Sequence, residues 1–181
     1  MELNNKPVSL FVYRLHQDDP RKCTAARLLR LNQAKPILNI HRISKNAVVL
    51  NPLVREVFCP GDRDYLNHGL IVIDGSWNKL DYRFGRGFKG IHRKLPLLLP
   101  ANPTNYARVS ILSSAEALAA ALYIAGWRNQ ANDLLNAFKW GPNFFILNRD
   151  ALEDYASAQT EAQILEIEKT YFERPTPVDE K

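Results

Sequence analysis

Cysteine is scarce in this chain of 181 residues. The two cysteines, Cys23 and Cys59, lie far apart in the sequence, and no Cys-x-x-Cys motif occurs. This pattern predicts neither a disulfide framework nor a zinc site, and a reducing cytoplasm is the natural setting. The histidines are equally sparse and show no ligand spacing (His16, His41, His68 and His92). We therefore expect no metal centre.

Long apolar runs are also missing. No stretch approaches the ~20 residues that a membrane-spanning helix needs, and the first residues, from Met1 to Pro7, do not resemble a secretory signal. Hydrophobic residues make up 46% of the chain and charged residues 24%. These values are typical of a soluble globular protein without a membrane partner.

Acidic residues are few in the first part of the chain. Residues 1–110 carry 18 Lys or Arg and 8 Asp or Glu, whereas residues 111–181 carry 6 and 11. A basic half favours a polyanionic partner, with nucleic acid the leading case. The alternative is a solvated surface whose charge bias has no function.

The most informative stretch is Leu70-Ile-Val-Ile73, followed by Asp74-Gly-Ser-Trp77. Four apolar residues without alternation predict a strand that is buried on both faces, as in a parallel sheet. Ligands of open α/β sheets bind beyond the carboxyl ends of such strands. Asp74 and Trp77 are therefore candidate site residues; a turn followed by a core tryptophan is the alternative.

Strands and helices are expected to alternate in the first half. Strands are predicted at 8–13, 47–50 and 70–73, and helices at 25–31 and 62–69, which favours a parallel α/β sheet. Segment 37–43 is either a short strand or a loop. The helix that begins near Thr24 has free backbone N–H groups that attract carboxylates or phosphates. Thr24 is thus either a ligand-binding residue or a local cap.

The loop at 79–94 combines basic residues, aromatic residues and glycines, which suits RNA contact. The alternative is a surface loop that packs its aromatic side chains inward. Beyond it, Ser113-Ser-Ala-Glu116 forms a capping box before an apolar run that ends at Gly126. Three more helices are predicted, at about 128–138, 143–154 and 160–173.

These segments, taken in order, resemble one family, the small-subunit (16S/18S) rRNA aminocarboxypropyltransferases of archaea and eukaryotes. The resemblance covers about residues 8 to 173. It is carried by Asp19-Pro-Arg-Lys-Cys-Thr24, Leu50-Asn-Pro52, Asp62-Arg63, Ile73-Asp-Gly-Ser-Trp77, Leu95-Pro-Leu-Leu-Leu-Pro-Ala-Asn-Pro103, Asn105-Tyr106, Leu112-Ser-Ser-Ala-Glu-Ala-Leu-Ala-Ala-Ala-Leu-Tyr123 and Phe138-Lys-Trp-Gly141.

The resemblance implies an α/β fold of the SPOUT-like class. Its N-terminal part would hold a parallel sheet with a trefoil knot, and its C-terminal part would be all-helical. Residues 1–102 would form the α/β part that binds S-adenosylmethionine (SAM) and RNA, and residues 103–174 would complete the SAM pocket. Residues 175–181 would be a flexible tail. The implied partner is small-subunit rRNA or the pre-ribosomal subunit. We expect a monomer if the helical C-terminal half covers the surface through which many SPOUT methyltransferases form knotted dimers; such a dimer is the alternative.

The implied reaction moves the 3-amino-3-carboxypropyl group of SAM to a (methyl)pseudouridine. By resemblance, Thr24 holds the amino-acid end of SAM, Ile73 the ribose, and Trp77 packs around the sulfonium methyl. The other implied cofactor residues are Leu50, Asn51 and Pro52 along the pocket, Asp74 beside the reacting atoms, and Leu98, Leu112 and Ser113 around the adenine. The implied RNA-binding residues are Arg83, Arg86, Lys89, Arg93 and Lys94.

Asp74 is the acid nearest to the implied chemistry. It is a candidate general base for a uracil-ring N–H, although an ordinary carboxylate is a weak base for that proton. A structural role for Asp74 is the alternative. Two other functions also remain open: a SPOUT-type RNA methyltransferase, which exposes a different carbon of the same cofactor, and a non-catalytic assembly factor that only binds rRNA.

Overall fold

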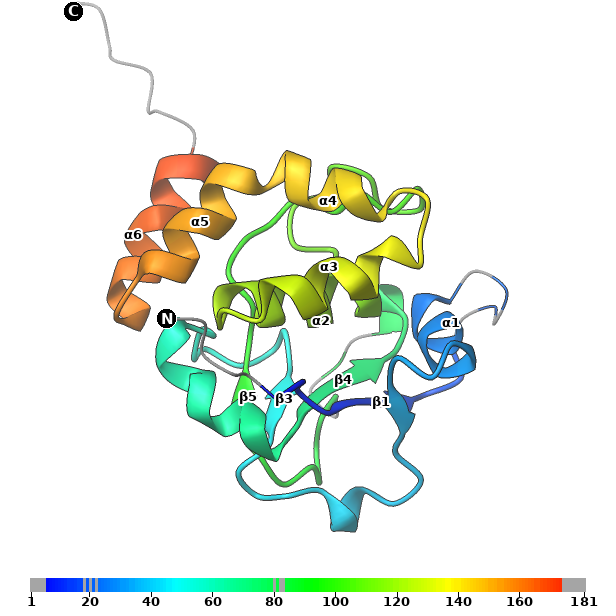
Figure 1. The fold of residues 1–181 in the computed structure, drawn as a ribbon. Helices are drawn as coiled ribbons and strands as arrows, with labels where there is room; N and C mark the ends of the chain where they lie inside the picture. Colours follow the sequence, from blue (N-terminus) through cyan, green and yellow to red (C-terminus); the bar gives the residue numbers. More distant parts are fainter. Residues whose placement is uncertain are drawn as a thin grey trace, which may run out of the picture.

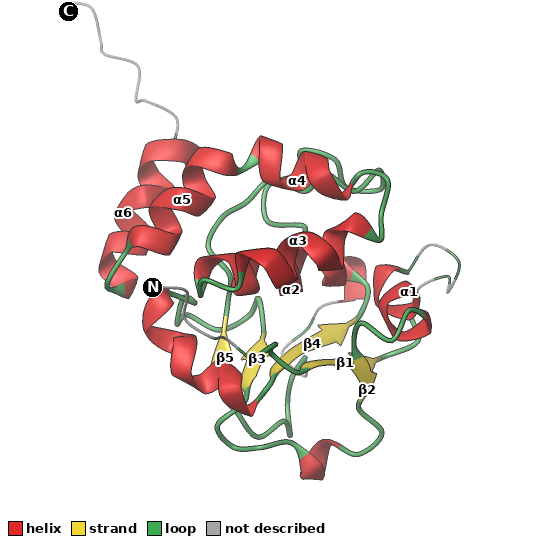
Figure 2. Ribbon diagram, viewed as in Figure 1, coloured by secondary structure: helices red, strands yellow, loops and turns green. Residues whose placement is uncertain are grey.

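The computed structural model describes residues 6–17, 19, 21, 23–79, 81 and 84–173. Five parallel strands form its sheet in the order β2-β1-β4-β3-β5 (Figures 1 and 2). The strands are β1 (Leu10–Arg14), β2 (Lys35–Pro36), β3 (Val48–Leu50), β4 (Leu70–Asp74) and β5 (Ile91–Arg93). The expected parallel α/β sheet is thereby confirmed.

Helices lie mainly on one side of this sheet. In Figure 1, α2 and α3 lie over the sheet, α4, α5 and α6 lie farther out, and the loop that carries η1 lies on the opposite side. The helices are α1 (Thr24–Arg30), α2 (Ser114–Ile124), α3 (Arg128–Asn136), α4 (Gly141–Leu147), α5 (Arg149–Ser157) and α6 (Glu161–Phe172), with 3-10 helices η1 (Ile40–Arg42), η2 (Pro60–His68) and η3 (Trp77–Lys79).

Strand β4 is the centre of the sheet. All five of its residues are buried, as its continuous apolar sequence predicts. Val72 pairs with Val12 of β1 on one side and with Leu50 of β3 on the other. The chain thus returns to the middle of the sheet at β4. Because β1, β4 and β3 are parallel neighbours, their carboxyl ends lie at the same edge of the sheet.

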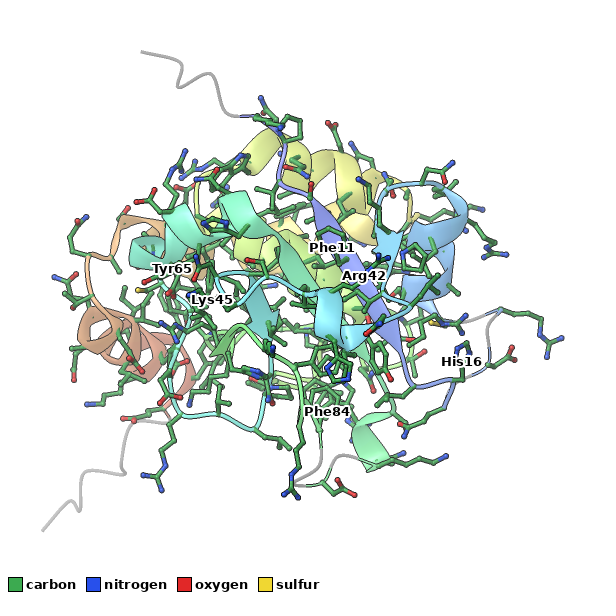
Figure 3. All side chains as sticks on the ribbon, turned by 90° about the horizontal axis from the view of Figure 1, so that it is seen from below. Phe11, His16, Arg42, Lys45, Tyr65 and Phe84 are labelled. Atoms are coloured by element: carbon green, nitrogen blue, oxygen red, sulfur yellow. The ribbon has the colours of Figure 1, made fainter. Side chains whose placement is uncertain are left out.

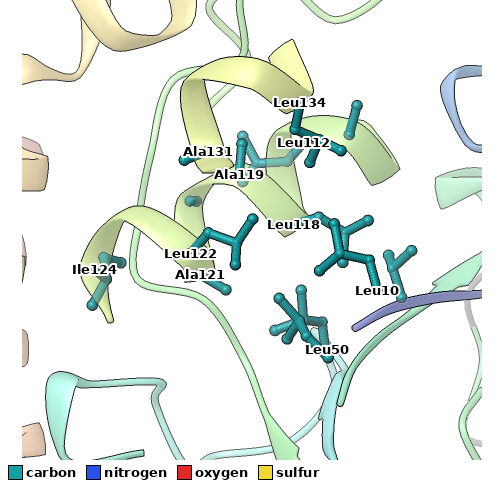
Figure 4. Close-up of a cluster of buried hydrophobic side chains, with 14 of the residues drawn as sticks. Leu10, Leu50, Leu112, Leu118, Ala119, Ala121, Leu122, Ile124, Ala131 and Leu134 are labelled. Carbon is teal, nitrogen blue, oxygen red and sulfur yellow. The ribbon is translucent and has the colours of Figure 1, made fainter. Parts of the chain in front are cut away.

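The main core fills the space between the sheet and α2 (Figure 4). Leu70 and Val72 point into it from β4, and Leu118 and Leu122 point into it from α2. Eight of the eleven residues of α2 are buried. Four of these eight are alanines, which allow α2 to approach its neighbours closely.

The opposite face of the sheet carries a second, smaller core. Val49, Ile71 and Ile73 alternate with the residues that face the helices, and loop side chains such as Phe84 and Phe88 cover them. Figure 3 views the molecule from this side and labels Phe84 there, together with Arg42 and Lys45 around η1. Loops therefore protect a face that many parallel sheets cover with helices.

Several elements differ from the sequence predictions. Strand β5 lies inside the segment predicted as a loop, and segment 37–43 contains η1 instead of a strand. The single helix predicted at 143–154 is two helices, α4 and α5, which separate at Asn148 because its side chain bonds to other backbone groups. The trefoil knot stays a prediction, and residues 175–181 lie outside the described part.

The packing of α2 gives a testable prediction. Leu122 is fully buried in the main core, so we expect Leu122→Ala to lower the free energy of unfolding by about 2–5 kcal/mol. Urea denaturation followed by circular dichroism measures this change. Leu38, which is 91% exposed, supplies the control, because Leu38→Ala should change the stability by only about 0.5 kcal/mol. Equal effects of the two variants would contradict this account of the core.

Candidate functional site

A mostly apolar cavity of about 320 Å³ lies beyond the carboxyl ends of β3 and β4. Leu50, Asn51 and Ile73 line it from these strand ends, and Leu112 lines it from the segment before α2. The other lining residues are Pro52, Val72, Gly75, Trp77, Phe84, Lys94, Leu95, Pro96, Leu97, Ser110, Ser113, Ser114, Ala117 and Glu168. We call this space the first chamber.

A second, more polar cavity of about 410 Å³ lies next to it. The two share the residues Gly75, Trp77, Leu112, Ser113 and Ser114. The second chamber is lined further by Asp19, Cys23, Thr24, Asp74, Ser76, Asn78, Asn102, Pro103, Thr104, Asn105, Arg108, Ile111 and Trp140. The site therefore consists of two adjoining chambers, one apolar and one polar, and Trp77 belongs to the wall that they share.

Asp74 lies at the inner end of the second chamber and is buried. Its Oδ1 accepts a hydrogen bond from the Ser114 hydroxyl (2.8 Å), and its Oδ2 accepts one from the Cys23 thiol (3.1 Å). The Arg14 Nε atom lies 3.7 Å from Oδ2. Burial raises the pKa of the Cys23 thiol to about 11, so the thiol stays protonated at neutral pH and remains a donor to Asp74.

Thr24 joins the starts of two helices. It is the first residue of α1, and its Oγ1 accepts a hydrogen bond from the Ala115 N–H at the start of α2 (3.2 Å). The preceding Cys23 caps α1 through its Sγ, which accepts from the Ala26 N–H. Both helices thus begin at the second chamber, and their N-terminal ends favour a negatively charged group there.

Trp77 is fixed at the boundary of the chambers. Its indole Nε1 donates to the Leu112 carbonyl over 3.0 Å. This bond connects the loop after β4 with the segment before α2, although the two are 35 residues apart. The indole therefore has one orientation between the chambers.

The segment after β5, residues 95–102, is held by side chains of the helices. The Leu97 N–H donates to Glu168 (2.8 Å), and its carbonyl accepts from the Tyr155 hydroxyl (3.0 Å). The Asn148 side chain bonds both the N–H and the carbonyl of Leu99. These bonds supply the partners that a neighbouring strand provides in a sheet.

Glu116 holds the next part of this segment. Its carboxylate is fully buried and accepts hydrogen bonds from the backbone N–H groups of Ala101, Asn102 and Ser113. The side chains of Asn102 and Ser113 also donate to it. The predicted capping box of Ser113 and Glu116 is confirmed. The same carboxylate also fixes both ends of the loop between residues 101 and 113.

Glu168 and Lys94 are the charged residues of the first chamber. The pKa of the Glu168 carboxyl is raised, because the effect of burial outweighs the opposing effects of the hydrogen bond from Leu97 and of the nearby Lys94. Among the described residues, no group of three or more His, Cys, Asp or Glu side chains is arranged to hold a metal ion.

The sequence of this chain is similar to proteins of one family. A family profile described as "Ribosome biogenesis protein, C-terminal" matches residues 48–172. The chain is 40% identical over 167 residues to the 16S rRNA aminocarboxypropyltransferase of Methanosphaera stadtmanae, covering 91% of this chain and 98% of that protein. The protein of the same name from Vulcanisaeta distributa is 45% identical over 152 residues, or 82% of each chain. The chain belongs to the 16S rRNA aminocarboxypropyltransferase family.

A solved structure supports this membership at the level of the fold. It is the SAM-dependent rRNA:acp-transferase from Vulcanisaeta distributa, which matches this member of the family with a TM-score of 0.79 and 37% sequence identity. The match covers 90% of this chain and 96% of that one. The resemblance inferred from ordered motifs is thereby confirmed.

In this member of the aminocarboxypropyltransferase family, most of the expected cofactor residues lie together in the two chambers. Thr24 and Asp74 line the second chamber, and Leu98 is buried behind the lining, with its carbonyl accepting from the Ser110 N–H. The first chamber contains Leu50, Asn51, Pro52, Ile73, Trp77, Leu112 and Ser113. Sequence reasoning missed Cys23, Ser114 and Glu168, which are distant in sequence from the residues that they hold.

The expected RNA-binding residues differ in their surroundings. Arg86 and Lys89 are exposed. Arg93 is bonded to the buried Asp62 carboxylate over 3.0 Å, and Lys94 lines the first chamber. Arg83 lies outside the described residues. Among the four members of the group that the structure describes, Arg86 and Lys89 are thus the exposed cations.

The aromatic side chains of the loop at 84–88 decide between the two alternatives left open by the sequence. Phe84 and Phe88 pack against the second core, and Phe88 contacts Tyr13 edge to face with ring centroids 4.9 Å apart. They therefore face inward and are not exposed for base stacking. Gly85 allows this packing, because it has a φ of +74° and a Cβ there would lie 2.7 Å from the Asn51 side chain.

The Glu116 contacts give a second prediction. Removing this carboxylate leaves several buried donors without an acceptor, and each costs about 1–3 kcal/mol. We expect Glu116→Ala to destabilise the fold by about 3 kcal/mol or more and to weaken ligand binding in both chambers. Urea denaturation measures the first effect.

The matched control is Glu166→Ala, since Glu166 lies on the exposed face of α6 and pairs with Lys169. Its removal should cost about 0.5 kcal/mol or less. A Glu116 variant that is as stable as the Glu166 variant would show that the loop between residues 101 and 113 is held by other contacts.

Proposed function

We propose that this chain transfers the 3-amino-3-carboxypropyl group of SAM to a (methyl)pseudouridine of small-subunit rRNA during ribosome biogenesis. The observation that carries the proposal is the pair of joined chambers, which meet at Trp77 and collect the cofactor residues expected from the family. The relatives are named for this transfer, and the solved neighbour is described as SAM-dependent.

The residues present fit SAM in two ways. The first chamber is mainly apolar, which suits an adenosine, but the Ser110 hydroxyl that lines it is buried without a hydrogen-bond partner among the described residues. Such an orphaned group indicates a polar ligand atom beside it. The second chamber offers two helix N-termini near Thr24, which suit the carboxylate of an amino acid.

We propose that the chambers divide the cofactor. Leu50, Ile73 and Leu112 would surround the adenosine, and Thr24 would hold the amino-acid end. Trp77, fixed by its bond to Leu112, would lie beside the sulfonium and cover the methyl group. This placement would leave the carboxypropyl methylene open to attack, so positioning is the main contribution to the rate.

The sulfonium of SAM supplies an activated carbon and a good leaving group. A ring nitrogen of the nucleobase forms the new N–C bond, the S–C bond breaks, and neutral methylthioadenosine leaves. The nitrogen also loses its proton, which passes to solvent water. Both Asp74 oxygens already accept hydrogen bonds, which favours a positioning role for Asp74 over the role of general base.

The partner is small-subunit rRNA, and we propose that the exposed Arg86 and Lys89 bind its phosphates. The monomeric state and the cytoplasmic location stay predictions. Within the described residues, the structure contains no helix with the length and apolar character needed to cross a membrane. The division at residue 102 stays a proposal. The main core includes residues from both parts, so the two parts would pack together around one core.

The deciding experiment uses purified protein, small-subunit rRNA and two SAM preparations, one labelled in the methyl group and the other in the carboxypropyl chain. We expect only the carboxypropyl label in the RNA. Methyl label would instead establish a methyltransferase. No label, with SAM bound in calorimetry and hypomodified rRNA as substrate, would favour a non-catalytic assembly factor.

A separate prediction concerns the exposed loop. Arg86→Glu should weaken rRNA binding and lower the slope of log affinity against log salt by about 1, because a phosphate contact is lost. SAM affinity should not change. Filter binding at several salt concentrations gives the slope, and calorimetry gives the SAM affinity.

Arg149→Glu is the control, because Arg149 is an exposed arginine on α5 that lines neither chamber. An equal loss of rRNA affinity in both variants would indicate a general charge effect. Loss of SAM binding in Arg86→Glu would assign this loop to the cofactor pocket.

A further inference from the structure

The second chamber is lined by both buried and exposed residues. Asp74 and Cys23 lie at its buried inner end, whereas Thr104, Arg108 and Asn78 are exposed. The chamber thus leads from solvent to the position beside Trp77. An acceptor nucleobase has to reach that position to come into line with the reacting carbon.

Trp140 is an aromatic residue of the same chamber. It is half-buried at the start of α4, and it packs on Phe138 with ring centroids 5.0 Å apart. The indoles of Trp77 and Trp127 each donate to a backbone carbonyl. The Trp140 Nε1 has no acceptor among the described residues, so it is available to a ligand.

The loop between residues 101 and 113, which also lines the second chamber, is held in an unusual conformation. Ala107 and Ser110 have positive φ angles of 57° and 65°, although neither is a glycine. Hydrogen bonds from Ala107 N to the Pro100 carbonyl and from Ser110 N to the Leu98 carbonyl hold them there. Strained backbone of this kind clusters at ligand sites, where surrounding contacts maintain it.

The polar groups of the same loop suit a nucleotide. The Asn102 amide is bonded to the buried Glu116, and the Asn102 Oδ1 accepts from the Asn105 N–H, which sets the shape of the loop. Arg108 is exposed and makes one long hydrogen bond, 3.4 Å, to the Asn105 side chain. Its guanidinium therefore remains largely available for a phosphate.

We propose that Trp140 and Arg108 form the subsite for the target nucleotide. The pyrimidine base, turned out of its loop, enters the second chamber and stacks on the Trp140 indole, and its phosphate binds Arg108. The Asn102–Asn105 turn lines the same chamber and bonds to Arg108 through the Asn105 side chain. The inference rests on the proposed function, because it places the acceptor of the same transfer reaction.

The test compares Trp140→Ala, Trp140→Phe and Arg108→Ala with the wild type. Stacking on an aromatic side chain stabilises a bound base. We therefore expect Trp140→Ala to lower kcat/KM for rRNA by about 10-fold or more. Trp140→Phe keeps an aromatic face for the base and for Phe138, so it should stay within about 3-fold of the wild type. SAM affinity by calorimetry should not change in any variant.

Arg149→Ala is the matched control for Arg108→Ala, because it removes an exposed arginine that does not line the chamber. Only Arg108→Ala should raise the KM for rRNA. Unchanged kinetics in Trp140→Ala would overturn the proposal. A parallel loss of SAM affinity would overturn it too, because Trp140 would then belong to the cofactor site.

A direct binding measurement separates this proposal from the proposed function. The probe is an oligonucleotide of the small-subunit target loop, titrated against each variant with S-adenosylhomocysteine present, and its Kd is measured by anisotropy. We expect Trp140→Ala to raise the Kd and Trp140→Phe to leave it nearly unchanged. If the wild type transfers no label, the proposed function fails, and equal Kd values would still overturn the subsite.

Discussion

The buried carboxylate of Glu116 is the interaction on which both chambers depend. A charge buried this completely is unfavourable unless every lone pair has a donor. Glu116 meets this condition by accepting from Ala101, Asn102 and Ser113. Because these donors flank the loop between residues 101 and 113, satisfying one helix cap also fixes the loop that bounds both chambers. Stability of the helix and shape of the site therefore come from one side chain.

The helical part acts on the sheet through single side chains. Glu168, Tyr155 and Asn148 bond the backbone of residues 97 and 99, where another strand is the usual partner. A segment held in this way keeps a lining face toward the first chamber without being extended into the sheet. The C-terminal helices are thus part of the binding site, although few of their residues line it.

What the sequence predicts well depends on local patterns. The continuous apolar run of β4 and the capping box of α2 act within a few residues, so their structures follow from composition and spacing. The short β5 and the break at Asn148 depend on partners that are distant in the sequence, such as the Leu99 backbone. The aromatic loop was ambiguous for the same reason: whether Phe84 and Phe88 face RNA or the core is decided by the uncovered face of the sheet.

The choice between the carbons of SAM is a question of orientation. Contacts to the adenosine would be the same whichever carbon faces the acceptor, and the same in the ground and transition states. They would therefore strengthen binding without selecting the carbon that is transferred. The decision falls on the boundary between the chambers, where Trp77 is fixed by the Leu112 carbonyl and Asp74 by Ser114. On the proposed placement of SAM, these bonds would determine which sulfonium substituent is covered and which one faces the acceptor. The reaction outcome thus depends on the rigidity of this boundary more than on the affinity for the cofactor.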